Sequence, residues 1–392
     1  MKRNIMIMYT MSLLQGMVFY GPIATLYRQV HGITVFQITL IESISIALCL
    51  LLEVPWGILA DKIGYRRTMI ICSWLYFASK IIFWQAKDFT GFLIERLILS
   101  VVYAGLSGVD SGILYLSCGG KDAQKVFGQY DSFGMLGLLI AAVVFSVFVK
   151  DHYQLAGLLT VFSYGAAALL SLGIREVRET KPEEREENAF RQSLKETIGN
   201  GTHLLFLIAV GLLFETHQTI TVFLNQIKFE SCGLDDTAIG IIYGIATLLG
   251  VTGFCSVFVT KRLGRIRSLS LFSLLPLTAC LLLAFTNTAG PAVIGVLTLR
   301  ISDTLFRPFQ EKINNDQIRT KNRATVLSIY SMIVSGVGIV TNLIFGFLSD
   351  RSLTAAFLFG GGICFLSLVF FVIWYLKNRG NHFAKPDKAA NP

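Results

Sequence analysis

The chain has 392 residues, of which 53% are hydrophobic and only 15% are charged. An average soluble domain is about a quarter charged, so this composition excludes an ordinary water-soluble enzyme, a disordered chain and a fibrous protein. The net charge is +9. Because Lys and Arg stand in short runs between apolar stretches, we attribute this excess to orientation in a membrane rather than to nucleic-acid binding.

Twelve stretches are long and apolar enough to cross a bilayer, which takes roughly 20 residues as a helix. Their uninterrupted character favours helices over the alternating strands of a membrane barrel. In chain order they cover 5–27, 35–60, 68–86, 90–117, 125–149, 153–174, 203–227, 238–260, 268–286, 291–317, 324–348 and 354–376. We therefore predict an all-α, multi-pass protein of the cell membrane that works as a monomer.

The distribution of Lys and Arg predicts the orientation of these spans. With the N-terminus in the cytoplasm, 25 of the 34 basic residues lie on the inner side and five on the outer side. The positive-inside rule then places both termini in the cytoplasm, which requires an even number of spans. The remaining four basic residues fall within the spans: Lys80, Arg96, Arg300 and Arg307.

The longest polar stretch separates two sets of six spans. It contains a charged run followed by apolar residues at four-residue spacing, Phe190, Leu194 and Ile198, which predict a short helix on the membrane surface. Basic turns around Gly64 and Gly264 give the halves a weak internal symmetry, as in transporters built from repeats. The predicted organisation is an N-terminal bundle at 1–174, a cytoplasmic linker at 175–202, a C-terminal bundle at 203–378 and a cytoplasmic tail at 379–392.

The loop after the second span carries a recognisable motif. It reads Gly57-Ile-Leu-Ala-Asp61-Lys-Ile-Gly64-Tyr65-Arg66-Arg67 and is preceded by Glu53-Val-Pro-Trp. The run resembles the GxLADrxGrk signature of the major facilitator superfamily, in the E-x-P-x-G-x-L-A-D form of a large bacterial clade. Two further stretches resemble that clade: the run from Ser107 through Asp110 to Tyr115, and Ile313-Asn314 with Arg323-Ala-Thr-Val-Leu-Ser328.

This resemblance covers essentially the whole chain and implies two pseudo-symmetric six-helix bundles that work by alternating access. It also implies that the loop latches the bundles while the transporter is open outward. Glycines permit the tight turn, and Asp61 can face the N-terminus of a neighbouring helix. Tyr65 replaces the basic residue usual after the second glycine. The predicted cytoplasmic gate comprises Glu53, Gly57, Asp61, Gly64, Arg66, Arg67 and Glu311.

Charged residues within spans are costly, at roughly 2.5–3.5 kcal/mol each on insertion scales. In the tenth span Arg300, Asp303, Arg307 and Glu311 fall on one helical stripe with alternating signs, so neighbours can pair. In the fourth span Arg96, Ser100, Tyr103, Ser107 and Asp110 lie near one direction. By the resemblance, spans 1, 4, 7 and 10 surround a central cavity. Candidate cavity and substrate residues are Gln15, Arg96, Tyr103, Ser107, Gln218, Arg300, Asp303 and Arg307.

Structural alternatives stand beside these assignments. Arg96 and Arg300 could brace neighbouring helices, and Asp303 with Arg307 could be an ion pair rather than a titrating site. For His217, a helix–helix hydrogen bond is an alternative to a proton relay. Glu42 could equally bond a neighbour, Glu95 could pair locally, and Lys80 can extend its amine outward to the membrane surface.

Glu215 is the first candidate for proton coupling. It lies mid-span with no evident cation in its own helix, and burial disfavours an ionised carboxylate. Asp110 is the second candidate. If the transported solute and a proton compete for or share this acid, its protonation biases the inward–outward equilibrium.

The abundance of Phe, 30 residues, suits a small amphipathic or apolar solute, and we expect proton-coupled efflux. The alternative is proton-coupled uptake of a metabolite, since the fifth span, with Gly134-Met-Leu-Gly137, lacks the G-P-x-x-G-G pattern of many drug:proton antiporters.

A non-transporting receptor or a membrane enzyme is the alternative of another class. No HExxH, P-loop or GxSxG motif supports an enzyme, and no CxxC spacing supports a metal. The expected partners are the bilayer, the solute and protons, with no cofactor.

Overall fold

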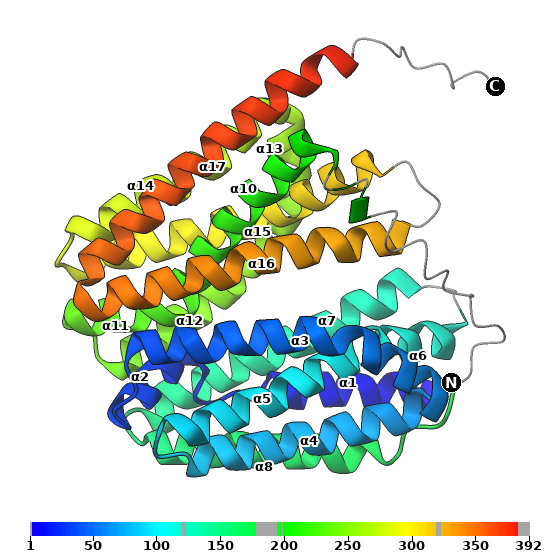
Figure 1. Cartoon of the computed structure of the whole chain (residues 1–392). Coiled ribbons are helices and arrows are strands. Elements are labelled where there is room, and N and C mark those ends of the chain that lie inside the picture. The colour runs from blue at the N-terminus through cyan, green and yellow to red at the C-terminus, as the bar shows by residue number, and fades with distance from the viewer. Residues whose placement is uncertain are drawn as a thin grey trace, which may run out of the picture. The chain divides into compact units, whose positions relative to one another are not determined.

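The computed structural model describes residues 2–119, 123–177, 194, 195, 197, 199–318 and 323–382, and the regular structure within them is helical (Figure 1). In chain order the elements are α1 (Lys2–Gly16), η1 (Gly21–Ile23), α2 (Ala24–Val30), α3 (Val35–Ile63), α4 (Tyr65–Gln85), α5 (Phe89–Leu106), α6 (Val109–Cys118), α7 (Ala123–Val144), η2 (Phe145–Val149), α8 (Tyr153–Ser171), α10 (Gly201–Gln218), η3 (Thr219–Leu224), α11 (Asn225–Ser231), α12 (Asp236–Leu249), η4 (Gly250–Cys255), α13 (Ser256–Leu263), α14 (Arg265–Phe285), α15 (Ala289–Gln317), α16 (Arg323–Arg351) and α17 (Leu353–His382).

Ten helical stretches among the described residues are long and apolar enough to cross a membrane. They correspond to ten of the twelve predicted spans. The predicted span 5–27 is divided into α1, η1 and α2: α1 ends at Gly16, and helical structure begins again at Gly21. The predicted span 68–86 is the continuous helix α4, which falls outside the ten because it contains Lys80 among several polar residues.

Several predicted spans are not single regular helices. The fourth is broken between α5 and α6, where Gly108 adopts a φ of +80° that residues with a side chain rarely take. The seventh continues from α10 into the π-helical turn η3, and the eighth contains the 3₁₀ turn η4. Such irregular turns inside long helices are often found at functional positions.

The chain forms two compact units. Unit 1 comprises Met1–Glu183 and Val222–Leu248, and unit 2 comprises Glu184–Thr221 and Leu249–Pro392. The segment 222–248 belongs to unit 1 through contacts such as the hydrogen bond from the Thr25 backbone N–H to the Gln226 side chain, 2.7 Å long. The division into bundles at 1–174 and 203–378 remains a prediction.

Close backbone approach joins α1 to α7 within unit 1 (Figure 1). A Cβ at Gly16 would overlap the Gly134 carbonyl oxygen, and one at Gly137 would overlap the Leu13 carbonyl oxygen. Small residues let membrane helices come this close, so that van der Waals contact can hold them together. The glycines of the fifth predicted span therefore have a packing role.

Aromatic side chains fill the core of unit 2, where α10, α14, α15 and α17 meet. The Phe206 ring lies 4.7 Å from that of Trp374 and 5.4 Å from that of Phe371, between centroids. Phe272 and Phe306, also buried, extend this cluster towards α15. Aromatic residues bury a large area each and prefer such tilted pairings, so many of the chain's Phe residues stabilise helix packing.

Most of the predicted linker lies outside the described residues, including Phe190 and Ile198 of its predicted surface helix; Leu194 is described. The predicted tail from 379 is partly described, because α17 continues to His382.

Candidate functional site

Two ion pairs in unit 1 join α3, α4 and α5. The Arg96 guanidinium on α5 forms an ion pair with the Glu42 carboxylate on α3, and both side chains are largely buried. The pair joins the two helices. This geometry fits the bracing alternative for Arg96 as well as a place at the edge of a solute site.

Lys80 on α4 forms a second buried pair, with Glu95 on α5. Its amine lies 3.3 Å from Glu95 Oε1 and donates a hydrogen bond of 3.1 Å to the Tyr20 hydroxyl. The rings of Tyr76 and Tyr164 lie 5.2 and 5.3 Å from the amine. The prediction that Lys80 extends outward is wrong: its side chain is 5% exposed, because a carboxylate and aromatic faces replace water around the charge.

The fourth predicted span does not present one continuous polar stripe. Ser100 is buried towards α3, where its hydroxyl lies 2.8 Å from that of Ser45. Tyr103 is 41% exposed and lies near Tyr76, with 3.3 Å between the hydroxyl oxygens. Ser107 and Asp110 lie at and beyond the break at Gly108 and therefore follow a different helix direction. The Asp110 carboxylate accepts a hydrogen bond of 2.6 Å from the Ser111 backbone N–H.

Gln15, near the end of α1, is the candidate from the first predicted span. Its side chain is half-buried, and its backbone carbonyl accepts a hydrogen bond of 2.6 Å from the Tyr164 hydroxyl. Tyr164 therefore links α1 to the surroundings of Lys80.

In unit 2, a single carboxylate on α15 gathers two arginines from the same helix. Arg307 Nε lies 3.0 Å from each of the two carboxylate oxygens of Asp303, and Arg300 Nη1 lies 3.8 Å from Oδ2. The spacings of three and four residues place these groups on one helix face. The Asp303 side chain is 6% exposed and that of Arg307 is 47% exposed, so the carboxylate of this pair is buried and the guanidinium is accessible.

His217 on α10 approaches the same carboxylate. Its Nδ1 lies 3.9 Å from Asp303 Oδ1, too far for a hydrogen bond. The ring is buried, and neither of its nitrogens is hydrogen-bonded to another side chain among the described residues. The next residue, Gln218, is half-buried. A buried imidazole so close to an acid is a feature that calls for a partner such as water, a proton or a ligand.

Glu215 faces α16 rather than the charges of α15. Its carboxylate is buried and accepts a hydrogen bond of 2.7 Å from the Thr219 hydroxyl, which also lies 3.2 Å from Asn342 Oδ1 on α16. A Cβ at Gly338 would lie 2.9 Å from Glu215 Oε2. Thr219 begins the π-helical turn η3. The acid therefore sits in a close contact between two helices, at a helical irregularity.

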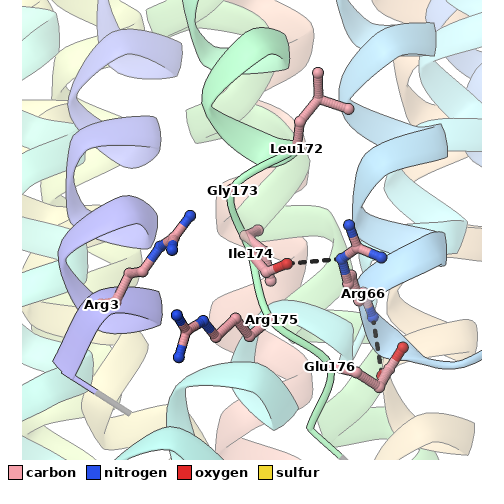
Figure 2. A pocket seen from close by; sticks show the side chains of 7 residues that line it. All are labelled: Arg3, Arg66, Leu172, Gly173, Ile174, Arg175 and Glu176. Carbon is pink, nitrogen blue, oxygen red and sulfur yellow. Dashed lines mark hydrogen bonds between the residues drawn. The ribbon is translucent and has the colours of Figure 1, made fainter.

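The predicted gate residues lie in the second halves of α3 and α15, at the turn between α3 and α4, and in the first turn of α4. Gly64 has a φ of +91° between α3 and α4, and a Cβ there would lie 2.8 Å from Glu176 Oε2. Arg66 Nε donates a hydrogen bond of 2.7 Å to the Ile174 carbonyl (Figure 2). Glu53 and Gly57 are half-buried, whereas Arg67 and Glu311 are exposed. The side chain of Asp61 lies outside the described ones.

Sequence reasoning did not pair Lys80 with Glu95, nor Thr219 with Asn342. The sequence does contain a feature that indicates the pairing of Lys80 with Glu95. The two charges lie at similar distances from the short loop that joins α4 to α5, and an antiparallel hairpin brings such positions to the same depth. For the second pair, 123 residues apart, no local pattern points to the contact. Among the described residues no cluster of His, Cys, Asp or Glu could hold a metal ion.

Comparison with known proteins identifies the fold. The sequence model of the Major Facilitator Superfamily matches residues 5–306, and no curated protein sequence matches the chain. The structure is similar to a point mutant of the nucleoside transporter NupG, with a TM-score of 0.82, 17% identity and coverage of 94% of this chain and 99% of that one. It is also similar to a D-xylose-proton symporter (TM-score 0.75, 11% identity, coverage 94% and 97%).

A third similar structure is a bacterial homolog to the human lysosomal transporter Spinster, in an inward-facing, unoccupied conformation (TM-score 0.73, 14% identity, coverage 98% of both chains). At such identities these structures bear on the fold alone. The family model covers well over half of the chain and the long apolar helices agree with it. The chain therefore belongs to the major facilitator superfamily and is a multi-pass secondary transporter rather than an enzyme.

Proposed function

We propose that this protein crosses the cell membrane twelve times and exports a small amphipathic or apolar solute in exchange for protons, by alternating access. The observation that carries the proton coupling is the buried carboxylate of Glu215 in the contact between α10 and α16.

Two helical stretches beyond the ten apolar ones complete the twelve crossings. Helix α4 has 21 residues and is therefore about 31 Å long, enough for the hydrocarbon core. It packs along α5 and α8, both of which are apolar enough to span. In the stretch from α1 to α2, α1 packs against α7 and α8, and α2 packs against α3 and α11. With twelve crossings, both basic termini lie in the cytoplasm.

The hydrogen bonds around Glu215 give its protonation a structural consequence. The Thr219 hydroxyl has one proton and two acceptors, Glu215 Oε1 at 2.7 Å and Asn342 Oδ1 at 3.2 Å. If Glu215 is protonated, its O–H donates to Thr219, whose proton then reaches Asn342. If Glu215 is ionised, the Thr219 proton turns to the carboxylate, and the Asn342 amide has to turn its nitrogen towards Thr219.

Protonation therefore changes which atoms face each other between α10 and α16. Such a difference in contacts is what allows a proton to favour one conformation over another. Asp110, in the first turn of α6 after the break at Gly108, is the alternative coupling acid. The Asp303 carboxylate is held by Arg307 in an ion pair, and we assign it to the solute-facing surface.

We assign the solute-facing surface to the candidate residues Gln15, Arg96, Tyr103, Ser107, Gln218, Arg300, Asp303 and Arg307. Tyr103 and Arg307 are the most exposed of the aromatic and charged members. Arg307 also lies over the Phe214 ring, 4.6 Å from its centroid, so an apolar surface adjoins a cation. That combination suits an amphipathic solute. The gate comprises Glu53, Gly57, Asp61, Gly64, Arg66, Arg67 and Glu311, as the loop motif implies.

Proton-coupled uptake of a metabolite is the second candidate. It is favoured by the similarity to a nucleoside transporter and to a sugar–proton symporter. A non-transporting receptor of the same fold would bind a solute without moving it.

Proteoliposomes with an imposed pH gradient distinguish these functions whichever way the protein inserts. Ethidium serves as an amphipathic probe, and radiolabelled uridine and D-xylose serve as metabolite probes. Exchange predicts that an acidic lumen drives ethidium accumulation, whereas symport predicts that an acidic bath drives accumulation of uridine or xylose. Glu215→Gln should abolish the effect of the gradient, and Glu230→Gln, at an exposed position on α11, should leave it intact. Ethidium entry that ignores the gradient in the unmodified protein contradicts proton exchange.

A further inference from the structure

A cavity of about 340 Å³ opens at one end of unit 1. Three segments contribute to it: the start of α1, the start of α4 and the chain that follows α8 (Figure 2). Its lining residues are Arg3, Arg66, Leu172, Gly173, Ile174, Arg175 and Glu176. Three of these seven are arginines: Arg66 is also a predicted gate residue, whereas Arg3 and Arg175 belong to no cluster described above.

The main chain around the cavity is held in place by side chains from other helices. The Asn4 amide accepts a hydrogen bond from the Arg175 backbone N–H and donates one to the Arg175 carbonyl, each 2.9 Å long. Arg66 Nε bonds the Ile174 carbonyl at 2.7 Å, and the Arg66 backbone N–H bonds Glu176 at 3.3 Å. The chain 174–176 is therefore fixed between α1 and α4, and the position of Arg175 is set by main-chain contacts.

The guanidinium groups gather around this fixed segment. Arg3 Nη2 lies 3.4 Å from the position of a Cβ at Gly173. Figure 2 shows the guanidinium of Arg175 directed towards Arg3 on one side of the segment, with Arg66 on the other side. Arg66 uses Nε for the Ile174 carbonyl, which leaves its two terminal nitrogens as donors.

The cavity carries an excess of positive charge. Glu176 is its one acid, and that carboxylate accepts from the backbone of Arg66. None of the three arginines has a carboxylate at ion-pair distance among the side chains that the structure describes. Arg3 and Arg175, which lie on the same side of the segment and have no acidic partner there, offer donors that suit phosphate oxygens, to which arginine binds through two parallel hydrogen bonds.

We propose that this cavity binds a phosphate group, supplied by the headgroup of an anionic phospholipid. The lipid is the favoured source because the cavity lies at the ends of membrane-spanning helices, where basic pockets on the cytoplasmic side recognise anionic headgroups. This placement rests on the proposed cytoplasmic N-terminus. The bound phosphate bridges Arg3 on α1 and Arg175 on the chain that leaves α8, and so stabilises the end of unit 1 from which the long polar stretch departs.

Lipid binding to the purified full-length protein in detergent tests the proposal. Native mass spectrometry would compare phosphatidylglycerol with phosphatidylcholine of the same acyl chains. We expect the anionic lipid to bind more tightly. Arg3→Gln and Arg175→Gln should each weaken it about fivefold, and together about 30-fold, since a basic residue near the surface contributes about 1 kcal/mol. Arg175→Gln keeps the Asn4 contacts because these use main-chain atoms.

Two further variants sharpen the test. Glu176→Gln removes the opposing charge, keeps an acceptor for Arg66, and should strengthen binding severalfold. Arg262→Gln, at an exposed arginine of α13 in unit 2, is the charge-matched control and should leave binding unchanged. Inorganic phosphate that displaces the lipid in the unmodified protein, but not in Arg3→Gln/Arg175→Gln, also supports the site and identifies a soluble phosphate as a second occupant.

Equal binding of the two lipids overturns the proposal, as does a loss in the arginine variants no larger than that in Arg262→Gln. The binding assay involves no solute transport, so its failure is separate from a failure of proton-coupled export. The orientation is checked independently by labelling a cysteine placed at Lys2 with a membrane-impermeant reagent in intact cells, where the proposal expects no labelling.

Discussion

Removing Lys80 should destabilise unit 1 more than any other single charge removal on α4. The Lys80 and Glu95 side chains are 5% and 1% exposed and lie 3.3 Å apart. Lys80→Met leaves the Glu95 carboxylate buried without its cation, which in a buried pair costs about 3–5 kcal/mol. The loss of the Tyr20 hydrogen bond adds to this effect. The free energy of unfolding is measured by titrating mixed micelles with sodium dodecyl sulfate and following helicity by circular dichroism.

A double-variant cycle separates the pair from general disturbance. Lys80→Met combined with Glu95→Leu removes both charges, and apolar replacements of a buried pair are often neutral or stabilising. The double variant should therefore be more stable than Lys80→Met alone. Lys87→Met, at an exposed lysine beyond the end of α4, is the control and should change stability by less than about 0.5 kcal/mol. The reasoning fails if Lys80→Met resembles this control, or if the two single effects simply add.

Three further predictions follow from other contacts. Gly137→Leu places a side chain against the Leu13 carbonyl and should lower the free energy of unfolding by about 1–3 kcal/mol in the same assay. Gly128→Leu, where a Cβ would meet no atom within 4 Å, should cause no such loss, and equal losses in the two variants contradict the packing role. Thr219→Val removes the hydroxyl but keeps the shape, and should alter the pH dependence of transport; an unchanged pH profile excludes the hydrogen-bond chain. Asp303→Asn weakens the hold on the two arginines of α15 and should slow transport by about tenfold, roughly 1.4 kcal/mol, measured as initial rate; a rate within twofold of the unmodified protein contradicts a role for that cluster.

The helical, membrane-spanning architecture could be predicted from sequence because it depends on a strong local signal. A run of about 20 apolar residues leaves few alternatives to a helix in a bilayer. The breaks were harder to predict. Gly108 at +80° interrupts the fourth predicted span, but a glycine in an apolar run is also common inside continuous membrane helices. Helical periodicity alone therefore places Asp110 on the same stripe as Arg96, although the two lie on separate helices.

Charge pairs were predictable within a helix and poorly predictable between helices. Asp303 and Arg307 are four residues apart, and helical periodicity alone places them together. Glu42 with Arg96, and Lys80 with Glu95, depend on which faces of neighbouring helices meet. The sequence also does not indicate that Glu215 faces α16. A helical position specifies a direction around its own axis but not which neighbour lies there.

The central claim is that protonation of Glu215 shifts the equilibrium between inward- and outward-open forms. Spin labels on cysteines replacing Lys62 and Lys261, in a variant without the seven native cysteines, report the separation of the cytoplasmic ends by electron–electron resonance. We predict two distance populations whose ratio changes between pH 5 and pH 8 and becomes independent of pH in Glu215→Gln. A single distance at both pH values, or a pH shift that persists in Glu215→Gln, would contradict this account.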